Sequence, residues 1–433
     1  MRDAWHGARR PGLGAKVAAP VSLCVLLLCL SVAACVPSRR AAVPPHRVLL
    51  SVLAGQSTTD PGIEVMIDDL LKTRVPDVDL AWERMDWGEK FQSAMQAKFA
   101  AGEVPDLMIG KAQDVATYAP TGNLAPVSDH LLQYVKDSAI PGVSVAGRAY
   151  GIPYNAFYQG VFYNKEIFAS RGVRVPTTRA GLQQVVTSLQ AAGITPFAAH
   201  FAESWYVGNI VMQFALGDVF SRDPNWGTHL REGATSFQGS PAFRQCFLDV
   251  RQVLRWSWKD ALTMDFTESD QRFAAGKAAM YVTGSWSLQA IDTQKPHISV
   301  GVFPWPNRDG TARLIFEPNM TFMESSRTPH PDAVQQVLQA VFESGDLASE
   351  ILDFTKTSSM LRDFTPDAPL LIQPDIDRAQ KTGMVTDATV GNTQLIWSFQ
   401  DRVARQLGQW LQGKVELDEV LRDADANRSL SSS

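Results

Sequence analysis

Short apolar runs alternate with helically spaced apolar residues between positions 48 and 110, and this alternation limits the possible folds more than any other feature. Residues 48–53 and 107–109 are predominantly apolar runs bounded by a glycine, and residues 78–82 alternate apolar with polar. Two helical patterns lie between them, formed by Ile63, Met66, Ile67, Leu70 and Leu71, and by Phe91, Met95 and Phe99. This β-α-β-α-β order predicts an α/β fold with a largely parallel sheet and right-handed crossovers.

The N-terminus has the organisation of a secretory signal peptide. Residues 1–20 contain Arg2, Arg9, Arg10 and Lys16, and an apolar run follows at 21–32. The run is shorter than the ~20 residues of a spanning helix. Cys35 follows Ala33 and Ala34 in SVAAC, which resembles a lipobox, so we expect Cys35 to become the lipidated first residue. Cleavage nearby and an uncleaved anchor are the alternatives, and Arg9-Arg10 is only a weak twin-arginine signal.

The rest of the chain is expected to form two lobes. Removal of residues 1–34 leaves 399 of the 433 residues, which is too long for one ordinary core, and residues 38–47 suit a tether. Helical spacing recurs at Leu182, Val185, Val186 and Leu189, and at Val334, Val337, Leu338 and Val341. The net charge of −5 gives no reason to expect nucleic-acid binding.

Cys246 would be the one thiol left after lipidation of Cys35, because Cys24 and Cys29 belong to the signal segment. The mature chain then has no partner for an internal disulfide. Cys246 shares helical spacing with Phe243, Phe247 and Val250, which predicts a buried core thiol without chemistry.

Several motifs, taken in order, resemble the bacterial extracellular solute-binding proteins of the sugar-importer class, which include the maltose-binding proteins. The resemblance extends from about residue 48 to 421. The motifs are FAAGEVPD at 99–106, YAPTGNLAPVSDHL at 118–131, YGIP at 150–153 with FYNK at 162–165, GVRVPTT at 172–178, FAAGKAAM at 273–280, and GSW at 284–286. Two departures stand out: Arg179-Ala180-Gly181 replaces the usual aromatic and acids, and EPNMTFMESS at 317–326 lacks the family's glycine pair.

The resemblance implies a periplasmic-binding-protein-like fold: two α/β lobes, a hinge of three crossing segments and a ligand cleft between the lobes. Such a protein is a monomeric importer subunit that delivers a solute to ABC permease subunits. We expect the crossings near Asn155, Phe316 and Asp367. The expected division is 1–34 signal peptide, 35–47 lipidated N-terminus and linker, 48–154 plus 317–366 N-lobe, and 155–316 plus 367–433 C-lobe.

Aromatic side chains are the first candidates for a sugar site, since flat rings cover the apolar faces of a sugar. The candidates are Trp286, Tyr154, Tyr158, Trp205, Trp305 and Trp397. Trp286 follows a strand-like run, where related sugar binders stack a tryptophan on ligand. Tyr158 and Trp305 fit a site or the core equally. One of Trp205 and Tyr206 is expected in the core, and the apolar neighbours of Trp397 favour the core for it.

Polar candidates come from strand ends and from the crossings, where side chains could hydrogen-bond sugar hydroxyls. Gln56, Glu83 and Lys111 follow the first three predicted strands, at the edge where open α/β sheets bind ligands. Asn155, Glu317 and Asn319 lie beside the first two crossings. Each of these residues also fits a solvated loop or hinge packing.

Alternatives to a sugar importer subunit are a binding protein for a polyol phosphate, an amine or a peptide, and an exported glycosidase. The Asp68-Asp69 pair fits the solvated face of a helix rather than a glycosidase pair. The chain has no H-E-x-x-H, G-x-S-x-G or phosphate-loop motif, and its seven histidines are scattered. We therefore expect binding without catalysis and without a metal or other cofactor.

Overall fold

The computed structural model describes residues 47–55, 61–85, 89–294, 296–366, 369–390 and 397–428. Gln56, Cys35 and residue 367 of the third expected crossing lie outside this part. The side chain of Trp397, the first residue of its helix, is also outside it. No helix among the described residues is both long and apolar enough to span a bilayer.

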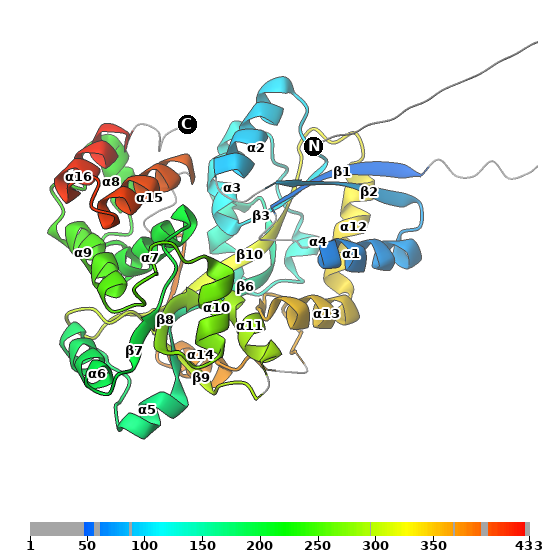
Figure 1. Cartoon of the computed structure of the whole chain (residues 1–433). Coiled ribbons are helices and arrows are strands. Elements are labelled where there is room, and N and C mark those ends of the chain that lie inside the picture. Colours follow the sequence, from blue (N-terminus) through cyan, green and yellow to red (C-terminus); the bar gives the residue numbers. More distant parts are fainter. Residues whose placement is uncertain are drawn as a thin grey trace, which may run out of the picture. The chain divides into compact units, whose positions relative to one another are not determined.

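The first lobe contains the predicted β-α-β-α-β unit (Figure 1). Its elements are β1 (Val48–Gly55), α1 (Pro61–Arg74), β2 (Val78–Met85), α2 (Glu89–Ala101), β3 (Leu107–Gly110) and α3 (Ala112–Tyr118). Strand β1 pairs in parallel with β2 and with β3, as predicted. Two later helices complete this lobe, α12 (Pro331–Glu343) and α13 (Gly345–Thr355).

Helices cover both faces of this part of the sheet, because β1 is apolar on both of its sides. Leu50 and Val52 pack with α1, α12 and α13 in one core. Leu53 packs with α2 and α3 in a second core on the other side. The predicted helix faces are confirmed, since Ile63 and Ile67 of α1 are buried and the four predicted positions of α12 are buried as well.

The second lobe is built around a single large apolar core. Its strands are β7 (Thr195–Ala198), β8 (Ala278–Gly284) and β9 (Val300–Phe303). Its helices are α5 (Lys165–Arg171), α6 (Arg179–Ala191), α7 (Ser204–Ala215), α8 (Trp226–Glu232), α9 (Pro241–Arg255), α10 (Phe266–Ala274), α11 (Leu288–Thr293), α14 (Gln373–Lys381), α15 (Trp397–Leu411) and α16 (Leu417–Ala426). Cys246 of α9 is fully buried in this core and carries no disulfide, as predicted.

Two long strands belong to both lobes and make one continuous sheet. They are β6 (Ile152–Asn164) and β10 (Leu314–Glu324), which pair antiparallel in the order β2-β1-β3-β10-β6-β8-β7. Along β6, Tyr154 belongs to the first-lobe core and Ala156 to the second-lobe core. Along β10 the order is reversed, since Phe316 belongs to the second-lobe core and Met320 to the first-lobe core. Short strands β11 (Ser358–Ser359) and β12 (Val385–Asp387) flank β6 and β10.

Met320 has an unusual backbone in β10, with φ of 46°. A positive φ is rare for a residue with a side chain and costs about 1–3 kcal/mol. The side chain of Met320 is fully buried in the first-lobe core. Core packing therefore holds a strained residue in the middle of a crossing strand.

The second-lobe core gives a direct test of these packing assignments. Phe247 of α9 is fully buried, and its ring lies 5.9 Å from that of Phe243. Phe247→Ala should lower the free energy of unfolding by about 3–5 kcal/mol, because it opens a cavity in this core. Val65→Ala is the control, since Val65 is 57% exposed, and should change it by less than about 0.5 kcal/mol. Equal effects in urea denaturation would contradict the assignment.

Candidate functional site

Parallel strands from the two lobes end at the same place, the middle of the crossing strands. In the first lobe β3 ends at Gly110, which pairs with Thr321 of β10. In the second lobe β8 runs parallel to β7 and ends at Gly284, which pairs with Gln159 of β6. Ligands of open α/β sheets bind beyond the carboxyl ends of strands. The carboxyl ends of β3 and β8, where a ligand would bind, therefore both lie beside β6 and β10.

The crossing strands present two different faces. Residues that pair across antiparallel strands share a face, and successive residues alternate between faces. Glu317 pairs with Phe157 and Asn319 with Asn155, whereas Phe316 pairs with Tyr158. We name the side chains of Asn155, Phe157, Gln159, Glu317 and Asn319 the polar face. Tyr158 and Phe316 belong to the opposite face.

A hydrogen-bond network runs over the polar face from one lobe to the other. Lys111, which follows β3, donates to Glu317 Oε1 at 2.9 Å. Gln159 donates its amide to the other oxygen of Glu317 and accepts from Asn209 of α7 at 3.0 Å. Gln213 of α7 then donates to Asn209 Oδ1 at 2.9 Å. The network thus joins the end of β3, both crossing strands and α7.

Glu317 is a buried charge, with 5% of its surface exposed, and its two partners explain how it is tolerated. A buried carboxylate needs an opposite charge and hydrogen-bond donors, which Lys111 and Gln159 supply. Asp387 of β12 lies nearby. Burial raises the pKa of Asp387, and the negative charge of Glu317 raises this pKa further.

Trp286 lies where β8 ends, in a 3₁₀ turn over Ser285–Ser287. Its indole covers Gly284, where a Cβ atom would come within 2.3 Å of the ring. The indole meets the Phe157 ring edge-on, with centroids 5.2 Å apart. Its Nε1 is buried without a hydrogen-bond partner in the described part of the chain. The turn therefore places a partly exposed indole beside the polar face.

Comparison with known proteins identifies the family of this chain. The family model described as "Bacterial extracellular solute-binding protein" matches residues 54–346. The chain belongs to this family. It is 24% identical to the multiple sugar-binding protein of Streptococcus mutans over 249 residues, which are 55% of this chain and 58% of that protein. The chain thus matches just over half the length of this curated relative.

Solved structures show that the family fold extends over nearly all of this chain. A chitin oligosaccharide binding protein superposes with a TM-score of 0.74 at 19% identity, covering 89% of this chain and 99% of that one. A solute-binding protein in complex with raffinose gives 0.72 at 18% identity, with 89% and 100% covered. The fold is therefore periplasmic-binding-protein-like, with two lobes, as predicted. Membership of this extracellular family implies an extracytoplasmic location.

Two predicted site residues of this solute-binding protein lie in the cores instead. The ring of Tyr154 is fully buried, 5.3 Å from the Phe342 ring. The ring of Trp305 stacks on Phe214 at 4.1 Å, and its Nε1 donates to Asp249 at 3.4 Å. Each ring fills space between elements of its own lobe, which favours the core alternative for Trp305 and speaks against a ligand contact for Tyr154.

The remaining candidates are spread over several environments. Glu83 is exposed on β2 and forms an ion pair with Lys98 at 2.8 Å. Trp205 is the second residue of α7 and is 41% exposed, while the neighbouring Tyr206 is the core member of that pair. Asn155 and Asn319 are both 1% exposed on the polar face, and the Oδ1 atom of each is without a partner in the described part.

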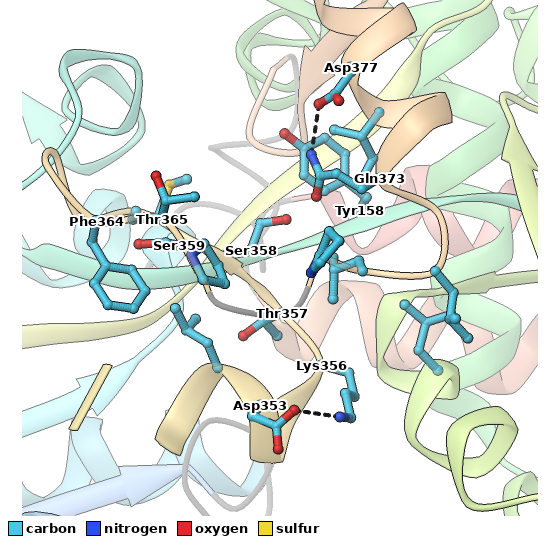
Figure 2. A pocket seen from close by; sticks show the side chains of 18 of the residues that line it. Tyr158, Asp353, Lys356, Thr357, Ser358, Ser359, Phe364, Thr365, Gln373 and Asp377 are labelled. Atoms are coloured by element: carbon cyan, nitrogen blue, oxygen red, sulfur yellow. Dashed lines mark hydrogen bonds and ion pairs between the residues drawn. The ribbon is translucent and has the colours of Figure 1, made fainter. Parts of the chain in front are cut away.

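Tyr158 lines a cavity on the face opposite the polar face, with a volume of about 830 Å³ (Figure 2). Its hydroxyl accepts a hydrogen bond from Gln380 of α14 at 2.7 Å. Burial raises the pKa of Tyr158 to about 12. Lys356, which follows α13, forms ion pairs with Asp353 at 2.7 Å and with Asp292 of α11 at 3.2 Å. This cavity therefore lies between first-lobe and second-lobe elements, and Trp286 is not among the residues that line it.

Sequence reasoning missed Phe157, Gln159, Asn209 and Gln213. The signal for the first two was the strand period of two, since positions 155, 157 and 159 share a face. Asn209 and Gln213 are four residues apart on one helix and so lie on the same side of it. The part of the chain that the structure describes contains no group of three or more His, Cys, Asp or Glu residues placed to hold a metal ion.

The Lys111–Glu317 pair predicts a large effect of removing one charge. Glu317→Gln should lower the free energy of unfolding by about 3 kcal/mol, because it replaces a buried carboxylate that two donors share. Glu83→Gln is the matched control, since it removes the carboxylate of an exposed ion pair and should cost less than about 1 kcal/mol. Urea denaturation of both variants at neutral pH measures the difference. A small effect at Glu317 would show that this network contributes little.

Proposed function

We propose that this chain is the substrate-binding component of an ABC importer, and that it captures a sugar or short oligosaccharide between its lobes. Bound sugar would favour the closed arrangement of the lobes, which a membrane permease then recognises. Family membership supports the binding role. Relatives and neighbours of this chain are named for maltotriose, raffinose, stachyose and chitin oligosaccharides.

The observation that carries the proposal is the aromatic pair beside the polar network. Trp286 and Phe157 offer apolar ring surface, while Lys111, Gln159 and Glu317 offer donors and acceptors within the same region. A sugar needs both, since it has apolar C–H faces and a rim of hydroxyl groups. Asn155, Asn319 and Trp205 remain candidate contacts. Tyr158 also remains a candidate, because it lines the cavity on the opposite face, whereas Tyr154 and Trp305 are buried in the cores.

The arrangement suits binding better than hydrolysis. A glycosidase needs one carboxylic acid held protonated and a second carboxylate across the cleft. Glu317 instead accepts hydrogen bonds from Lys111 and Gln159, so each of its two oxygens already has a donor within the protein. We therefore propose capture and release without covalent chemistry. A non-sugar solute, such as a polyol phosphate, an amine or a peptide, is the alternative that a ligand screen would reveal.

Thermal-shift screening with the named sugars tests this proposal. A sugar at about 100 times its Kd should stabilise the protein by about 2.7 kcal/mol. We expect Trp286→Ala to abolish this shift and to leave the unliganded melting temperature nearly unchanged. Trp305→Ala is the control, because it should lower the unliganded melting temperature and retain the sugar-induced shift. A Trp286→Ala variant that still responds fully to sugar would contradict the proposed site.

We also propose that a lipid on Cys35 anchors the protein to the cell membrane. The prediction is that Cys35→Ser abolishes incorporation of labelled palmitate and moves the protein from the membrane fraction to the soluble exported fraction. Cys246→Ser is the matched control, since Cys246 is buried in the second-lobe core and should not affect the anchor. Palmitate incorporation that survives Cys35→Ser would place the lipid elsewhere.

A further inference from the structure

Asp270 is a buried carboxylate behind the turn that carries Trp286. It lies on α10 and is 5% exposed. Its Oδ1 accepts a hydrogen bond from Ser287 Oγ at 2.8 Å, and Ser287 Oγ lies 2.9 Å from Thr283 Oγ1 of β8. Ser287 is the last residue of the 3₁₀ turn that contains Trp286. Asp270 therefore holds one end of this turn.

The other end of the turn is held by a crossing strand. Ser285 Oγ accepts a hydrogen bond from the backbone N–H of Tyr158 at 3.2 Å. Ser285 and Ser287 are both almost fully buried, whereas Trp286 between them is partly exposed. The direction of the indole thus depends on two fixed points, one on β6 and one on Asp270.

The surroundings of Asp270 provide no compensating positive charge. Aromatic residues pack around it, including Tyr206 of α7 and Tyr281 of β8, both of which are fully buried. In the described part of the chain, no Lys or Arg forms an ion pair with it. His200 is stacked on Tyr206 at 3.9 Å, and its Nδ1 lies 2.7 Å from Glu203. Burial also lowers the pKa of His200.

Burial raises the pKa of Asp270 to about 7, while the hydrogen bond from Ser287 opposes this rise. Charged and neutral forms of the carboxyl group are then both populated near neutral pH. A hydrogen bond to an ionised acceptor is roughly twice as strong as one between neutral groups. Loss of the proton should therefore tighten the bond from Ser287.

We infer that Asp270 is a positioning residue for Trp286, which fixes the 3₁₀ turn when its carboxylate is charged and loosens the turn when it is neutral. The orientation of the indole then varies with pH. The positioning itself is independent of the ligand. Its consequence, tighter sugar binding at higher pH, rests on the proposed function.

Fluorine NMR of protein labelled with 5-fluorotryptophan tests the positioning directly, without a ligand. The Trp286 resonance is identified as the signal that is lost in Trp286→Phe. Between pH 5.5 and 8.5 this signal should shift along a titration curve with a midpoint near 7. In Asp270→Asn, which retains the shape but has no titrating proton, the signal should not shift. A flat wild-type signal, or a titration that persists in Asp270→Asn, would overturn the inference.

Two further variants separate Asp270 from its surroundings. Ser287→Ala removes the link to the turn and should flatten the Trp286 titration while Asp270 still titrates. In His200→Gln the Trp286 signal should still shift with pH. If the shift disappears in this variant, His200 rather than Asp270 causes it.

The pH dependence of the protein's stability shows whether Asp270 itself titrates. Its pKa is raised in the folded state, so the folded protein retains the proton while the unfolded chain loses it. Stability should therefore fall as the pH rises from about 4 to 7. The melting temperature of the wild type and of Ser287→Ala should drop more between pH 5 and 7.5 than that of Asp270→Asn. Equal drops in all three would show that Asp270 does not titrate in this range.

Calorimetry with raffinose and maltotriose as probes measures the consequence for binding. The wild type should bind a probe about fivefold more tightly at pH 8 than at pH 6, because a stronger bond orders the turn. Asp270→Asn should show no such difference. If neither probe binds, the proposed sugar function loses its support, while the NMR titration still decides the positioning role. Equal wild-type affinity at both pH values would overturn the link between the turn and binding.

Discussion

Strands β6 and β10 pair along the middle of the sheet, and both lobes depend on this pairing. Each strand starts in the core of one lobe and ends in the core of the other, so the two cores share their central strands. The same pairing fixes which side chains face each other across the strands. It places Glu317 opposite Phe157, beyond the end of β3 and beside the end of β8. The candidate site is thus a direct result of strand register.

Polar groups rather than an apolar seam cross between the lobes at this point. Lys111, Glu317, Gln159 and Asn209 form one connected set, in which the buried carboxylate has two donors. Buried polar groups of this kind are tolerated when they are satisfied, and they then define one geometry strongly. On the opposite face, Lys356 and Asp292 form a second charged contact between elements of different lobes. A bending motion would have to preserve or exchange these partners.

The sequence was sufficient to predict the parallel strands of the first lobe and the buried faces of its helices. Periodicity indicates which residues face a core, and Ile63, Ile67 and Val334 are buried as expected, as is Leu182 in the second lobe. Periodicity was not sufficient on β6, because its residues are almost all buried and show no alternation. The strand period of two puts Tyr158 and Phe157 on opposite faces, but only the register against β10 shows which of these faces carries Glu317. The burial of Trp305 could not be predicted either, because the ring on which it stacks, Phe214, is distant in sequence.

The two faces of the crossing have an implication for how such proteins can diverge. Insertion of one residue in the middle of β6 would rotate every following side chain to the other side of the sheet. The side chain of Tyr158, which lines the cavity on the opposite face, would then lie on the polar face beside Trp286. Substitutions at single positions leave this division intact. Lineages of this protein should therefore tolerate length variation in surface loops but retain the residue count of β6.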